Sequence, residues 1–210
     1  MFTRLALTCW LLAGAASAQN WFVGAGGGYG FAPKLTISGL TPDAKTGFEN
    51  GGVVGAYFGE DTHKYWSGEV HYLHRWDKLA ISQGGTNVNF AGHSDILHAD
   101  FLRHFAPRGS KFRPFIAAGG GIRFLAGSGN ESSSQPLGNY AALTATSESL
   151  PVLDAAVGVR VKFHNRVELR FEVRDYMSPA PSKVIALAPG ASLGGWLNDI
   201  VASVCIGYSF

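Results

Sequence analysis

Charged residues at every second position are the strongest chemical signal in this sequence. Between residues 168 and 174 the chain reads Glu-Leu-Arg-Phe-Glu-Val-Arg, and the charged members of this segment are Glu168, Arg170, Glu172 and Arg174. Alternate residues of a β-strand lie on the same face of the sheet. The pattern therefore predicts a strand with opposite charges along one face, where they can form ion pairs with one another.

A second set of residues is a candidate for nucleophilic catalysis, which needs a serine arranged with a histidine and a carboxylate. The nearest match is His93-Ser94-Asp95. Adjacent strand residues point to opposite faces of a sheet, so His93 and Ser94 cannot form the required hydrogen bond if a strand has begun there. We therefore expect no enzymatic activity.

Metal and cofactor sites are not predicted either. His98 and His104 share a strand face with Asp100, but a spacing of six residues between the histidines is too wide for a tight pair of metal ligands. We interpret them as hydrogen-bonded histidines. The glycine-rich segment 24–30 partly matches a dinucleotide-binding fingerprint, but no helical pattern follows it.

The composition limits the class of protein. Of 210 residues, 15% are charged and 12% are aromatic, and 17 basic residues nearly balance 15 acidic ones. Disordered chains are rich in charge and poor in aromatic residues, and nucleic-acid-binding proteins carry basic clusters. Both classes are therefore excluded, and no nucleic-acid partner is expected.

The first 18 residues have the pattern of a cleaved secretory signal peptide. Arg4 precedes a short apolar run, and Ala16-Ser17-Ala18 matches a cleavage site. The run is shorter than the roughly 20 residues that a membrane-spanning helix needs. Residues 19–210 are then the mature chain, in which Cys205 is the single cysteine, so no intramolecular disulfide is expected.

The mature chain alternates apolar and polar residues in eight runs, the pattern of half-buried strands. Several runs approach the 9–11 residues with which a tilted strand crosses a bilayer. Long and short connections alternate between them, which predicts an all-β fold, an eight-stranded antiparallel up-and-down transmembrane β-barrel in one domain. The runs are 21–31, 48–58, 66–76, 95–105, 112–126, 153–163, 167–173 and 196–210, and the long connections are 32–47, 77–92, 127–150 and 177–195.

The apolar face of this barrel is expected to contact lipid. The polar faces carry arginine and carboxylates in similar numbers, whereas a solvated surface is normally rich in lysine. Aromatic residues gather near the ends of the runs, as an interfacial girdle requires. The alternative is a soluble periplasmic barrel with an apolar interior, which would show the same alternation.

The polar face then lines the lumen. Side chains fill the interior of an eight-stranded barrel, and buried charges must be paired, so we predict a lumen plugged by ion pairs. Interior glycines are expected to leave room for arginine side chains, namely Gly24, Gly26, Gly28, Gly119 and Gly121. The predicted network consists of Glu69, His71, Arg75, His98, Asp100, Arg123, Asp154, Arg160, Lys162, Glu168, Arg170, Glu172, Arg174 and Asp199.

Three segments resemble a known family, the OmpA-like outer-membrane β-barrels. Residues 113–121 (RPFIAAGGG) and 168–176 (ELRFEVRDY) look like its fifth and seventh strands, and Gly207-Tyr208-Ser209-Phe210 resembles its C-terminal signature. The resemblance implies an outer-membrane location, contact with outer-membrane lipid, and recognition of Tyr208 and Phe210 by the assembly machinery. The resemblance does not extend to the peptidoglycan-binding domain that better-known members carry after the barrel, so we expect no cell-wall tether.

These observations favour a structural or surface-interaction role without catalysis. The long loops are a possible site for a surface ligand, since loops on a rigid scaffold often carry binding. A narrow passive pore for small solutes or ions is the alternative function, because the same lumen charges would tune its selectivity.

Overall fold

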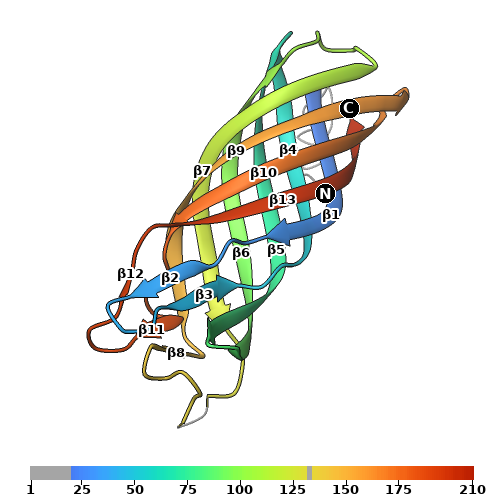
Figure 1. Cartoon of the computed structure of the whole chain (residues 1–210). Coiled ribbons are helices and arrows are strands. Elements are labelled where there is room, and N and C mark those ends of the chain that lie inside the picture. Colours follow the sequence, from blue (N-terminus) through green and yellow to red (C-terminus); the bar gives the residue numbers. More distant parts are fainter. Residues whose placement is uncertain (1–19, 132–133) are drawn as a thin grey trace, which may run out of the picture.

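The chain folds into a closed β-barrel (Figure 1). The computed structural model describes residues 20–131 and 134–210, so the predicted signal peptide lies outside the described residues. Each long strand pairs antiparallel with its two neighbours in the ring, and β13 returns to β1 with Phe22 opposite Ser209. The eight strands, in ring order, are β1 (Trp21–Phe31), β4 (Gly51–His63), β5 (Trp66–Gln83), β6 (Thr86–His104), β7 (Phe112–Gly127), β9 (Ser147–His164), β10 (Val167–Pro179) and β13 (Trp196–Ser209).

The predicted eight-stranded antiparallel barrel is therefore confirmed. The short turns and the two chain ends of the described barrel lie at one end, which we call the turn end, and the long connections lie at the other, the loop end (Figure 1). No helix in the described part of the chain is long and apolar enough to span a membrane.

Apolar side chains cover the outside of the barrel and charged ones lie inside. On β9, for example, Leu153 and Val157 are exposed, whereas Asp154 and Arg160 are buried. This is the reverse of a soluble barrel with an apolar interior, so that alternative is wrong. Large exposed aromatic side chains mark both ends of the apolar surface, Trp66, Phe105, Phe112, Phe163 and Phe210 toward the turn end and Tyr29, Phe31, Trp76, Phe124 and Trp196 toward the loop end.

One predicted loop is in fact a hairpin. We expected a long loop over 77–92, but β5 and β6 continue through this segment to a tight turn at Gly84-Gly85, with Gln83 opposite Thr86. Both glycines have positive φ, +55° and +87°, the conformation that two-residue hairpin turns require. The polar residues of 77–92 suggested a loop because the strands here extend past the apolar surface, where their outward side chains meet water.

The long connections also contain short strands. Three of them, β2 (Leu35–Ser38), β3 (Ala44–Phe48) and β12 (Ser192–Leu193), extend the main sheet, and β8 (Ala141–Leu143) pairs with β11 (Ile185–Leu187). Together with the loop ends of the barrel strands they bury an apolar cluster, which we call the apolar lid. Its buried members are Ala32, Ile37, Ala44, Phe48, Leu79, Ile81, Phe90, Leu125, Tyr140, Ala141, Leu143, Val184, Ile185 and Leu197.

A buried carboxylate fastens one of these connections to the start of a barrel strand. Glu148, at the start of β9, accepts hydrogen bonds from the backbone N–H groups of Ser182, Lys183 and Val184, each at 3.1 Å. Three donors on one carboxylate make charge-assisted bonds, which are stronger than neutral ones. The connection after β10 is therefore held against the first residues of β9, over the loop end of the lumen.

Candidate functional site in the barrel lumen

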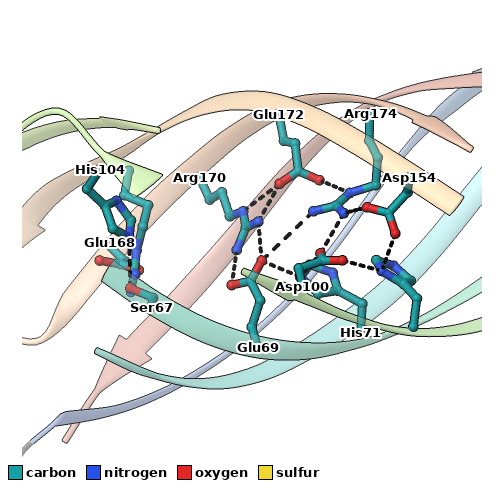
Figure 2. A network of polar contacts seen from close by, with 12 residues as sticks. Ser67, Glu69, His71, Asp100, His104, Asp154, Glu168, Arg170, Glu172 and Arg174 are labelled. Atoms are coloured by element: carbon teal, nitrogen blue, oxygen red, sulfur yellow. Dashed lines mark hydrogen bonds and ion pairs between the residues drawn. The ribbon is translucent and has the colours of Figure 1, made fainter. Parts of the chain in front are cut away.

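The central part of the lumen is crossed by an arginine that binds a carboxylate on the opposite wall. Arg170 on β10 donates to both carboxylate oxygens of Glu69 on β5, at 2.8 and 2.6 Å, and its Nε donates to Glu172 at 3.0 Å. β5 and β10 lie four strands apart in the eight-stranded ring, so this pair spans its diameter (Figure 2). The guanidinium also stacks between the rings of Tyr57 and Phe115, 4.7 Å from each centroid.

Arg174, four residues further along β10 on the same face, joins three carboxylates. Its Nε donates to Glu172 at 2.8 Å, and its Nη1 donates to Asp100 on β6 at 2.5 Å and to Asp154 on β9. Because Glu172 receives donors from both arginines, the two sets of contacts form one connected group (Figure 2). We call these six residues the central network: Glu69, Asp100, Asp154, Arg170, Glu172 and Arg174.

Two histidines complete the hydrogen bonding of this network. Nε2 of His71 lies 2.6 Å from Glu69, and Nδ1 of His98 lies 2.9 Å from Asp100 and 3.2 Å from Asp154. The two rings stack with their centroids 4.8 Å apart. The central network has four carboxylates and two guanidiniums, so the imidazoles supply donors to carboxylates that the arginines alone do not saturate.

A second ion-paired layer lies nearer the loop end. Arg75 on β5 and Arg123 on β7 both bind Asp199 on β13. The distance from Nη2 of Arg123 to Oδ2 of Asp199 is 3.3 Å. Arg75 also donates to the backbone oxygen of Glu49 at 2.8 Å. Buried Leu73 and Val201 lie between this layer and the central network on their strands, so the polar layers alternate with an apolar one.

A third layer lies toward the turn end. Arg113 donates to both oxygens of Asp61 at 2.8 Å, and Nε of Arg160 donates to Glu168 at 2.6 Å. Asp61 was missed from the sequence because the second strand was predicted to end at Phe58, whereas β4 continues to His63 and turns Asp61 inward. Arg113 lay on the predicted polar face but was not assigned to the network.

Most of the predicted network residues point into the lumen and meet a partner of opposite charge. Lys162 is the exception, since it is half-buried and forms no ion pair with any described residue. It stands next to the β9–β10 turn, where the lumen opens to water, so its ammonium does not need a buried partner. The sequence pattern assigned it to the lumen from strand parity alone, which does not indicate depth.

The predicted role of the interior glycines is also corrected. Substituted Cβ atoms would meet Tyr57 at Gly24, Asp100 at Gly119 and His98 at Gly121, and at Gly26 and Gly28 they would meet the backbone of β13. At none of these five glycines is arginine among the nearest contacts of the added Cβ. Gly30, which was not singled out, is the glycine whose Cβ would lie 2.7 Å from an arginine, Arg75. These glycines make room for close strands and for the partners of the arginines.

Gly119→Ala is expected to destabilise the barrel by about 1–3 kcal/mol, the usual range for overpacking. A Cβ there would lie 2.0 Å from Oδ1 of Asp100 and 2.2 Å from the backbone oxygen of Ala99, so the central network would have to shift. Gly68→Ala is the matched control, because a Cβ at that strand position meets nothing within 4 Å. Urea unfolding of the two variants in lipid vesicles compares them, and equal midpoints would contradict the expectation.

The lumen also contains a serine next to a histidine. Oγ of Ser67 lies 2.8 Å from Nε2 of His104, and Ser67 donates its proton to Asp61 at 2.5 Å. Acyl transfer needs the reverse order, with the carboxylate on the histidine and the histidine accepting the serine proton. Ser94 is buried while its neighbour Asp95 faces outward to His74 at 2.8 Å, so His93-Ser94-Asp95 forms no triad either.

Two groups in the lumen have the residue types of a metal site. They are Glu69, His71 and Asp100, and His98, Asp100 and Asp154, and in each the ligand atoms lie within 4.8 Å of one another. Arg170 and Arg174 already neutralise these carboxylates. A divalent cation would therefore have to displace a guanidinium, so the donor set fits ion pairing rather than metal binding.

No known family model matches the chain. No curated protein matches it in sequence either. Solved structures do match it in fold. Neisserial surface protein A has a TM-score of 0.57 and 10% identity over 90% of this chain and 97% of its own. The outer membrane protein OprG from Pseudomonas aeruginosa has a TM-score of 0.57 and 12% identity over 92% and 97%. With its apolar exterior and charged lumen, the chain has the fold of the small, OmpA-like outer-membrane β-barrels.

Proposed function

We propose that the protein is an integral outer-membrane barrel with a structural or surface-interaction role, and that ion pairs plug its lumen. The contact between Arg170 and Glu69 supports this proposal most directly, because it joins opposite walls at mid-lumen. A cavity beside Arg170 and Glu172 has a volume of only about 30 Å³, against about 400 Å³ for the cavity at the turn end of the lumen. The apolar lid adds a second closure at the loop end.

Two partners belong to this proposal. Outer-membrane lipid would cover the apolar exterior, and the assembly machinery would read the last strand, where Tyr208 and Phe210 are exposed on the same outer face. The packing of β8 against β11 gives the long loops a defined shape, which a surface ligand can recognise.

Ion conductance across a planar bilayer tests the plug. We expect the wild-type barrel to give no steady conductance, because buried ion pairs occupy three successive layers of the lumen. The double variant Glu69→Ser with Arg170→Ser removes both charges and most of their volume, and we expect it to conduct. Removing both partners leaves no unpaired charge from this pair, so the double variant should cost less stability than either single one.

Each result bears on the proposal. A steady open state of the wild-type barrel would overturn the plug and favour the narrow pore. A silent double variant, inserted to the same density, would show that the pair formed by Arg170 and Glu69 is not what closes the lumen.

A further inference from the structure

The turn end of the lumen opens into a cavity that none of the roles above uses. It has a volume of about 400 Å³ and lies between the β9–β10 turn, the β6–β7 turn and the ends of β1 and β13. We call it the turn-end vestibule. Five of its lining residues are basic, Arg108, Arg113, Arg160, Lys162 and Arg166, whereas Asp61 and Glu168 are its two acidic side chains. Even with a carboxylate at Phe210 counted, the basic groups are in excess.

Ion pairs among the described residues of the barrel do not neutralise this excess of positive charge. Arg108 donates to the amide oxygen of Asn20, and Arg166 donates to the hydroxyl of Tyr208 at 3.3 Å, so both have neutral partners. Lys162 has no ion pair with a described residue. Three cations around the mouth of the vestibule therefore have no ion pair with any residue that the structure describes.

A buried guanidinium at the base of the vestibule supplies the second observation. Arg160 is 2% exposed, and its Nη1 has no hydrogen-bond acceptor among the described residues, although Asp61 lies 3.6 Å away. Nε of Arg113, also buried, lacks an acceptor as well. A buried donor of a charged group that is left without an acceptor costs free energy. Both atoms are closed off from solvent, so an oxyanion would accept these donors by entering between the side chains at the base of the vestibule.

We propose that the turn-end vestibule binds a polyvalent phosphate anion. A guanidinium presents its donors in a planar fork that matches phosphate oxygens, and Lys162 adds a point charge beside it. A polyvalent anion fits the charge excess better than a single carboxylate. The phosphate can belong to a soluble anion or to the headgroup of an anionic lipid, since Trp21 and Phe210 line the vestibule and such aromatic residues gather at membrane interfaces.

Isothermal titration of the refolded full barrel with sodium pyrophosphate, in a neutral detergent, tests the site. We expect saturable binding that weakens as salt is added. The double variant Arg108→Gln with Lys162→Gln should bind at least about tenfold more weakly, since it removes two of the cations that line the vestibule. The matched control, Lys45→Gln with Lys183→Gln, removes the same charge from exposed residues of the loop end and should bind as the wild type does.

Heat-shifted migration on a gel verifies that every variant is folded before titration. Absence of wild-type binding at millimolar pyrophosphate would overturn the proposal. Equal affinities of the vestibule variant and the loop-end control would overturn it too, because binding would then follow net charge alone.

Nanodiscs distinguish the two sources of phosphate. Pyrophosphate is titrated into the barrel in phosphatidylcholine discs and in discs that also contain phosphatidylglycerol. Weaker pyrophosphate binding in the second kind, with no such difference between the two kinds of disc for the vestibule variant, would identify a lipid headgroup as the occupant. Equal binding in both would identify a soluble anion.

Discussion

Arg170→Glu is expected to destabilise the folded barrel by at least about 3–5 kcal/mol, the cost of breaking a buried ion pair by changing one partner. Arg170 is 1% exposed and holds Glu69 and Glu172. A glutamate in its place would bury three neighbouring carboxylates, and Arg174, which contacts Glu172, would be the one guanidinium of the central network left to offset them. Urea titration in lipid vesicles, with the folded fraction read from gel migration, measures the loss.

Arg166→Glu is the matched control for this variant. Arg166 lies just before the same strand, at the exposed β9–β10 turn, and its side chain contacts the neutral Tyr208. We expect its free energy of unfolding to stay within about 0.5 kcal/mol of the wild-type value, the range usual for surface changes. The stability of Arg170→Lys should lie between those of the other two variants, because lysine keeps the positive charge but loses the planar set of donors that binds both oxygens of Glu69. If Arg170→Glu unfolded at the wild-type urea concentration, the central network would not be what holds the lumen together.

Val157→Arg is expected to cost about 2–4 kcal/mol, and Phe163→Arg only about 0–1 kcal/mol. Both residues are exposed on the outer face of β9, but Phe163 lies six residues closer to the turn end. Six residues are about half of a membrane crossing, so Val157 falls near the bilayer midplane and Phe163 near the interface. An arginine at the midplane must be desolvated, whereas one at the interface remains hydrated.

The same vesicle assay measures both variants, and the difference between them is the result of interest. A membrane-spanning exterior predicts a steep dependence on depth. If both substitutions changed the free energy of unfolding equally and by less than about 0.5 kcal/mol, the outer face would behave as an ordinary wet surface. That outcome would contradict the membrane location of the barrel.

Strand parity made the fold predictable from the sequence. The alternation in β10, with Glu168 and Arg170 against Leu169 and Phe171, identifies both faces without knowledge of the neighbours. Strand ends were harder, because alternation continues past the membrane with water in place of lipid on the outer side. The hairpin at Gly84-Gly85 and the inward position of Asp61 were missed for this reason.

Ion pairs along one strand could be predicted, and Glu172 does pair with both Arg170 and Arg174, but partners across the lumen could not. Glu69 and Arg170 are separated by 101 residues, and whether they meet depends on the stagger with which the barrel closes. That stagger sets the height of every residue in the lumen, and no local pattern encodes it. The same missing quantity explains Lys162, whose parity is inward but whose height places it at the mouth.

The apolar lid gives the molecule two kinds of interior that respond differently to temperature. Within the membrane section, apolar side chains contact lipid in the folded barrel, and the packed interior is polar. In the lid the apolar side chains leave water, as in a soluble protein. Burial of this kind weakens on cooling. We therefore expect cooling to destabilise the packing of the loop end more than that of the rest of the barrel. The conformation of the long connections then depends on the temperature at which the cell grows.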